Sequence, residues 1–306
     1  MAFRRRRDGV YLGNLPAFKK LFPYVMLSRA ESTIYSKQKI DATRLLAFLE
    51  SYNSGKSRDE KLSLFHVFLT VISRTLYLRP ELNRFIVGRR FYQHRDISLT
   101  FIAKKRYSED AEESEVRMVF TGRETLEELR EKVNARLNQA RGDHRGSDDK
   151  LIDLVCGLPR PLLNAVVGMI KWMDYHNILP AALMDAFPLY TSMYIANLGS
   201  IGLGAPFHHL FEMGTASSFL VIGKIEKQPM VDEQGRIAAR DCLECAFTLD
   251  ERVSEGMNHA TSIIVFRNLL THPELLLERE LTLDRVLASG AERPPVSAWA
   301  DGPGRS

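Results

Sequence analysis

Cysteine is scarce in this chain of 306 residues, and the scarcity restricts its chemistry. The three cysteines, Cys156, Cys242 and Cys245, are too few for a disulfide framework and indicate a reducing compartment. Cys242 and Cys245 have the two-residue gap of a zinc or redox pair, but they lie in a predicted strand, where residues three apart point to opposite faces. The sequence contains no second pair of this kind, so we expect no metal site.

Long apolar runs and a strong net charge are also lacking. No apolar run reaches the length of a bilayer span, and the N-terminus lacks the apolar segment of a signal peptide, so we expect a cytoplasmic protein. The formal net charge of +4 is too weak to predict a nucleic-acid partner, which normally requires a concentrated basic face. A hydrophobic content of 45% in 306 residues is instead typical of a globular protein with a substantial core.

The two ends differ in composition from the rest. Residues 1–17 form a basic arm that begins with Arg4-Arg5-Arg6-Arg7, and a solvated extension is the simpler interpretation of it. Residues 281–306 end in a stretch rich in Pro, Gly, Ala and Ser, which predicts a flexible tail. We therefore expect residues 18–280 to form the folded domain.

The hydrophobic periodicity of this domain changes several times. Residues 62–78 predict an apolar helix, and the alternation in residues 97–105 predicts a half-buried strand. Thr125 and Glu128 form a capping box at the start of another helix. Residues 189–249 are mostly of β character, and a helix follows. This order predicts an α+β sandwich, with one mixed sheet and helices packed on one face.

Residues 151–183 predict apolar helices, with Trp172 and Met173 beside Lys171. Burial in the core is the simpler interpretation. A partner subunit or a membrane surface is the alternative, and a membrane mode that also uses the basic arm would give liposome binding that falls with salt.

Two stretches place polar groups where predicted strands end. One is a charged turn between a strand and a helix, Asp250-Glu251-Arg252-Val253-Ser254-Glu255-Gly256. The other is Tyr194-Ile195-Ala196-Asn197-Leu198-Gly199-Ser200-Ile201-Gly202. Together they resemble the catalytic domain of the dihydrolipoyl acyltransferases, in the 2-oxoacid dehydrogenase acyltransferase family, and more distantly chloramphenicol acetyltransferase. The resemblance extends over roughly residues 18–280 and includes Pro80-Glu81-Leu82-Asn83.

The resemblance implies a chloramphenicol acetyltransferase-like sandwich and a homotrimer with its active site between subunits. It implies transfer of an acyl group from a coenzyme A thioester to a small or carrier-bound acceptor. The lipoyl attachment and partner-binding segments of dihydrolipoyl acyltransferases have no counterpart here, so we expect a free-standing enzyme. Family members use a histidine in Asp-His-Arg-x-x-Asp-Gly as base, and a hydroxyl residue before the Asn of Asn-Leu-Gly as oxyanion donor. Such groups contribute about 10²–10⁴ and about 10²–10³ in rate.

Compared position by position, the scaffold is kept and both chemical groups are changed. Asp250, Arg252 and Gly256 match the signature, whereas Glu251 stands in place of the histidine and Glu255 in place of the second aspartate. In the other stretch, Ala196 stands in place of the hydroxyl residue, beside an intact Asn197-Leu198-Gly199. The resemblance then implies substrate-binding roles for Asn197, Gly199, Ser200 and Arg252, and structural roles for Asp250, Glu255 and Gly256.

Three hypotheses about the base remain open. Glu251 acts as base if burial raises the pKa of its carboxyl. Alternatively the base is His208 or His209, of which only one would face inward on a strand, or less directly His259 in the first turn of the following helix. In the third, catalysis is lost and the fold binds an acyl-CoA or a protein partner.

The oxyanion donor and the two adjacent histidines also have alternatives. Ser200, Ser192 or a backbone N–H of the glycine-rich stretch could replace the missing hydroxyl. In a purely structural interpretation, His208 and His209 pair with Glu212 or with a backbone carbonyl.

Overall fold

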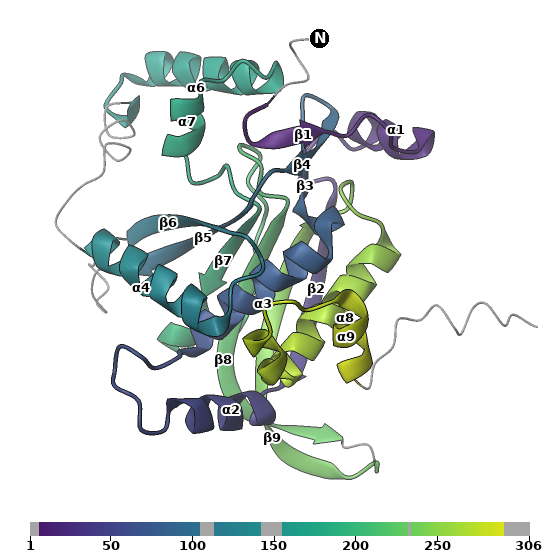
Figure 1. Cartoon of the computed structure of the whole chain (residues 1–306). Coiled ribbons are helices and arrows are strands. Elements are labelled where there is room, and N and C mark those ends of the chain that lie inside the picture. The colour runs from purple at the N-terminus through teal and green to yellow at the C-terminus, as the bar shows by residue number, and fades with distance from the viewer. Residues whose placement is uncertain (1–5, 105–112, 142–154, 232–233, 291–306) are drawn as a thin grey trace, which may run out of the picture.

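A six-stranded mixed sheet forms the centre of the molecule (Figure 1). The structure is a computed structural model and describes residues 6–104, 113–141, 155–231 and 234–290. The strand order is β2-β9-β8-β7-β5-β6. β7 runs parallel to both of its neighbours, and the other pairs are antiparallel. The strands are β2 (Thr33–Asp41), β5 (Ile97–Lys104), β6 (Glu113–Phe120), β7 (Met193–Asn197), β8 (Ser218–Val231) and β9 (Ile237–Asp250).

Helices cover one face of this sheet and enclose the main core with it. Phe247 and Leu249 of β9, and Met193 and Ile195 of β7, point into this core, as alternation along a strand requires. The helices that contribute to it are α2 (Thr43–Asn53), α3 (Leu64–Leu78), α4 (Leu126–Arg141), α8 (Gly256–Thr271) and α9 (Leu283–Ser289). The predicted α+β sandwich, with a mixed sheet and helices on one face, is confirmed.

The opposite, outer face of the sheet is covered by the chain itself. Tyr194, Phe219 and Ala246 point to this side and form a second apolar cluster with Ala205 and Leu210. The latter two belong to the segment that follows β7 and its short continuation η3 (Leu198–Ile201). Residues 199–217 therefore fold back over the outer face before β8 begins.

The folded part extends beyond both predicted boundaries. β1 (Gly9–Tyr11) joins a small sheet of order β1-β4-β3 with β3 (Arg84–Val87) and β4 (Arg90–His94). Arg6 is buried and pairs with Asp8 and Asp174, and Arg7 pairs with Asp185. At the other end, α9 buries Val286. Arg6 and Arg7 are thus engaged within the fold. Arg4 and Arg5, and the tail after residue 290, lie outside the described residues.

The apolar segment after α4 forms two helices, α6 (Arg160–Tyr175) and α7 (Ala181–Ala186), and residues 151–154 lie outside the described part. The prediction of core burial is wrong for Trp172, which is 58% exposed. In the part of the chain that the structure describes, no helix is long and apolar enough to cross a membrane. The remaining elements are α1 (Ala17–Val25), η2 (Pro80–Asn83) and η4 (Pro273–Leu277).

Candidate active site

The charged turn after β9 is held by a buried ion pair. Asp250 is fully buried, and its carboxylate accepts hydrogen bonds from Arg252 Nε at 2.9 Å and Nη2 at 2.8 Å. Arg252 Nη1 donates to the carbonyl of Met26 at 2.8 Å. The guanidinium of Arg252 therefore fixes the turn.

A second buried arginine ties the loop before β2 to the segment over the outer face. Arg29 donates from Nη1 to Phe211 O at 2.6 Å and from Nη2 to Gly214 O at 2.7 Å. The carboxylate of Glu212 accepts from the backbone N–H groups of Arg29 and Ala30. Burial lowers the pKa of Arg29, and the charge of Asp250 opposes that shift. The carboxylate of Glu212 thus binds the backbone at Arg29 and Ala30, and it does not pair with His208 or His209.

Glu251 itself points to solvent. Its backbone N–H donates to Ser32 O at 2.9 Å, and its exposed carboxylate has no hydrogen bond or ion pair within the described residues. The burial that the glutamate-base hypothesis requires is therefore not supplied by one chain.

The residues that follow Glu251 leave open space at the start of α8. Glu255 is exposed and lies 3.4 Å from the buried ammonium of Lys19. Gly256 is the first residue of α8, and a Cβ there would meet nothing within 4 Å. A glycine at this position is not demanded by packing within the chain.

The Asn197 stretch forms a tight turn against β8. A Cβ on Gly199 would lie 2.4 Å from the carbonyl of Gly223, so packing against β8 requires a glycine at this position. Ser200 Oγ donates to Asn197 O at 2.7 Å and belongs to its own turn. Ser192 is buried between strands, where its Oγ accepts from Ser98 N at 3.0 Å, so it cannot reach this turn.

The sheet register separates the two stretches within one chain. Asn197 pairs with Ile222 of β8, whereas the N–H of Asp250 donates to Ser217 O. Ile222 and Ser217 are five residues apart, which is about 17 Å along the strand, and two strand spacings add about 10 Å across the sheet. A cleft between Asn197 and Glu251 is therefore not formed within a single chain.

His208 lies over the outer face between these two ends. Its ring stacks on Phe219, with 3.9 Å between centroids, and on His209, with 4.6 Å. Phe219 pairs with Tyr194 on one side and Thr248 on the other. Thr248 Oγ1 donates to His208 O. Residues 203–211 have no regular secondary structure, so His208 and His209 do not lie on a strand as expected.

The hydrogen bond at His208 fixes its tautomer. Nδ1 lies 2.8 Å from the carbonyl of His209, and a carbonyl can only accept, so Nδ1 carries the proton. The lone pair of the neutral ring is then on Nε2. His209 repeats the pattern with Leu210 O at 3.2 Å, but its ring is exposed whereas that of His208 is half-buried. Of the two rings, that of His208 is thus the more firmly held.

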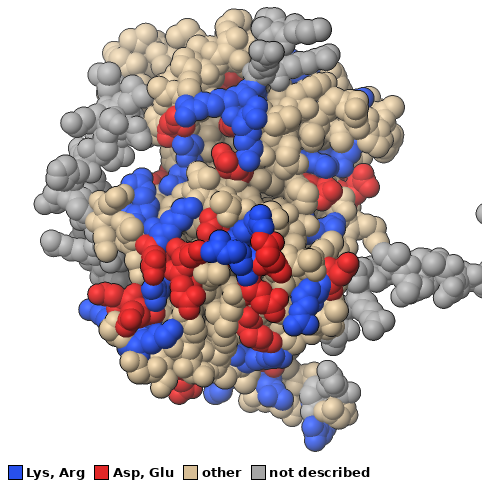
Figure 2. Space-filling model, in the orientation of Figure 1, with Lys and Arg blue, Asp and Glu red and all other residues tan. Residues whose placement is uncertain are grey.

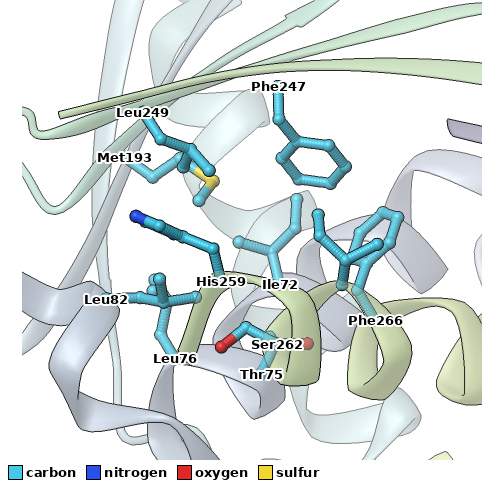
Figure 3. A pocket seen from close by; sticks show the side chains of 11 residues that line it. Ile72, Thr75, Leu76, Leu82, Met193, Phe247, Leu249, His259, Ser262 and Phe266 are labelled. Carbon is cyan, nitrogen blue, oxygen red and sulfur yellow. The ribbon is translucent and has the colours of Figure 1, made fainter. Parts of the chain in front are cut away.

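His259 belongs to the core instead. Its ring lies between Leu82 and Met193 beside an apolar cavity of about 20 Å³ (Figure 3). Neither ring nitrogen has a hydrogen-bond partner within the described residues, and the Ser254 backbone lies nearby without hydrogen-bond geometry. Burial lowers the pKa of His259 to about 4. This histidine is a neutral core residue away from the sheet's outer face.

Metal ligands do not gather anywhere in the described residues, where no group of three His, Cys, Asp or Glu side chains could hold an ion. Cys242 and Cys245 are both buried in β9, and burial raises the pKa of the Cys245 thiol.

Comparison with known proteins agrees with this architecture. The family model described as 2-oxoacid dehydrogenases acyltransferase (catalytic domain) matches residues 191–278, which include both polar stretches and the histidines. No curated protein matches the chain.

Several solved structures share the fold. Dihydrolipoamide acetyltransferase from Azotobacter vinelandii, studied for the role of a serine, a histidine and an asparagine in its catalysis, is 16% identical with a TM-score of 0.57. A probable dihydrolipoamide acetyltransferase from Listeria monocytogenes is 14% identical with a TM-score of 0.55; each alignment covers 88% of this chain and 95% of the other. A chloramphenicol acetyltransferase is 11% identical with a TM-score of 0.50, over 86% of this chain and 99% of the other. The resemblance stated from the sequence is confirmed, as is the fold.

Proposed function

We propose that this chain, which has the fold of the dihydrolipoyl acyltransferases, transfers an acyl group from a coenzyme A thioester to a small or carrier-bound acceptor, with His208 as base. The tautomer of His208 supports this most directly. A general base needs an available lone pair held in a fixed direction, and the bond from Nδ1 to the His209 carbonyl leaves Nε2 in that state. Stacking on Phe219 holds the plane of the ring.

The proton balance of the reaction is simple. His208 Nε2 accepts the proton of the acceptor's thiol, hydroxyl or amine as that atom attacks the thioester carbonyl. The tetrahedral oxyanion then collapses, the C–S bond breaks, and the coenzyme A thiolate takes the proton from the imidazolium. A base of this kind contributes about 10²–10⁴ in rate.

We further propose that the complete site forms between copies of the chain, as homotrimers of this fold imply. In β8, Ile222, which pairs with Asn197, lies three residues or about 10 Å from Phe219, on which His208 stacks, and the turn at Glu251 lies at the opposite end of the sheet. A neighbouring copy would bring the amide and the base together. Asn197 has a side-chain amide without a hydrogen bond in the described residues, and it is our candidate for the oxyanion donor in place of the hydroxyl lost at Ala196. The open space at Gly256 leaves room for close approach.

The test is release of free thiol from acetyl-CoA and longer acyl-CoA thioesters in a mixture of amine, alcohol and thiol acceptors. We expect turnover by the unmodified protein and a loss of about 10²–10⁴ in kcat for His208→Gln. His272→Gln, at the far end of α8, is the matched control and should keep full activity. Loss of activity in Glu251→Gln with full activity in His208→Gln would instead identify the glutamate as the base.

A non-catalytic module is the second candidate, because the oxyanion hydroxyl is replaced by Ala196 and the base by an exposed Glu251. This candidate predicts tight binding of an acyl-CoA or of a protein partner, with no thiol release in any acceptor mixture. Calorimetric titration with acyl-CoA, followed by the thiol assay on the same sample, separates it from the enzyme.

A further inference from the structure

Two helices at the same end of the molecule expose apolar side chains. In α6, Leu162, Met169 and Trp172 recur at helical spacing on one face, and Met169 and Trp172 are 57% and 58% exposed. In α1, Phe18 and Val25 are 72% and 66% exposed. The apolar stripe of each helix therefore faces solvent in place of the core.

The hairpin between β3 and β4 connects these two helices. Arg89 at its tip lies over the ring of Tyr24 in α1, 5.1 Å from the centroid. The next residue, Arg90, donates from Nη2 to the carbonyl of Tyr175 in α6 at 2.6 Å. A Cβ on Gly88 would lie 2.3 Å from that same carbonyl, so the tip is packed tightly against α6. The hairpin tip thus joins α1 and α6 into one surface, here called the α1–α6 surface.

The exposed charged side chains of α1, α6 and the hairpin tip are basic. The exposed basic residues are Lys20 of α1, Arg160 and Lys171 of α6, and Arg89 of the tip. The single acidic residue of the two helices, Asp174, is buried and pairs with Arg6. In Figure 2 uncharged surface covers α6 and α1 at the upper end of the molecule, and Lys and Arg side chains lie between them, with Asp and Glu side chains among them.

We propose that the α1–α6 surface binds an anionic lipid membrane, with both helices lying in the plane of the interface. Aromatic and aliphatic side chains flanked by lysine and arginine are the composition that inserts at the headgroup level, and basic side chains add attraction to anionic lipid. A two-fold contact between this face and the same face of a second copy is disfavoured, because it would bring the basic side chains together. This proposal does not depend on the proposed acyl transfer.

Trp172 provides the readout. The chain has two tryptophans, so Trp299→Phe leaves Trp172 as the single reporter. Vesicles of phosphatidylcholine with about one-third phosphatidylglycerol should shift its fluorescence to the blue and co-sediment with the protein, and pure phosphatidylcholine should bind roughly tenfold less. Raising the salt should weaken binding to the anionic vesicles.

Variants locate the contact. Met169→Glu should lower vesicle binding more than roughly tenfold, and Lys171→Gln roughly fivefold. Val231→Glu, at a site 67% exposed near the end of β8, is the matched control and should bind as the parent does. Equal binding by Met169→Glu and the parent, or no binding to anionic vesicles, would overturn the proposal. A smaller assembly mass for Met169→Glu by light scattering, without vesicle binding by the parent, would show that copies of the chain cover this surface instead.

Discussion

Replacing Arg252 by glutamine distinguishes a structural arginine from a substrate ligand. The change leaves the carboxylate of Asp250 fully buried without the two side-chain donors that it has now. Removing one partner of a buried ion pair typically costs about 3–5 kcal/mol. For a domain of this size that corresponds to a fall in Tm of roughly 6–20 °C.

The assay is thermal unfolding at fixed protein concentration, with two companion variants. Arg240→Gln removes one side of an exposed pair with Asp41, at 3.9 Å, and should cost less than about 1 kcal/mol. The double variant Asp250→Asn with Arg252→Gln should recover a large part of the loss, because no unpaired charge stays buried. An unchanged Tm for Arg252→Gln, together with a raised KM for the acyl-CoA, would refute the structural role.

Two further predictions concern stability. Burial lowers the pKa of His94 to about 4, so the unfolded chain, which protonates near about 6.5, binds this proton more readily than the fold does. The contribution of His94 to the free energy of unfolding is complete above about pH 6.5 and falls by roughly 3 kcal/mol toward pH 4. Urea unfolding of His94→Gln should therefore depend less steeply on pH than that of the parent. An equal slope would contradict the reasoning. Gly199→Ala should cost about 1–3 kcal/mol through its 2.4 Å approach to Gly223 O, whereas Gly204→Ala, with open space around it, should melt as the parent does.

Local sequence signals predicted the elements well. The apolar helix expected at residues 62–78 is α3 at Leu64–Leu78, and the alternating strand expected at residues 97–105 is β5 at Ile97–Lys104. Both halves of the Thr125 and Glu128 capping box are present. These features depend on spacing within a few residues, which the sequence displays directly.

Long-range contacts of the candidate site could not be predicted in this way. Arg29 bonds to Phe211 and Gly214 about 180 residues away, and nothing in the sequence near Arg29 marks these partners. The ion pair of Arg252 with Asp250 and the close approach of Gly199 to Gly223 were not predicted for the same reason, because a motif identifies a residue but not the groups that surround it. The separation of Asn197 from Glu251 follows from the strand register, which only the assembled sheet defines.

The exposure of Trp172 shows a further limit of sequence reasoning. An apolar helix that packs on a core and one that faces a partner have the same periodicity. Only the position of α6 outside the sheet and its helical layer distinguishes the two cases (Figure 1).

Mixing of inactive copies tests most directly whether an acyl-transfer site is shared between chains. Each variant, His208→Gln or Asn197→Ala, is expected to release little thiol from acyl-CoA when it is assayed without the other. If the base of one copy acts with the amide of its neighbour, random one-to-one reassembly should restore about a quarter of the parent's activity, because about a quarter of the sites then combine both intact residues. Recovery to no more than the level of the separate variants would contradict the shared site.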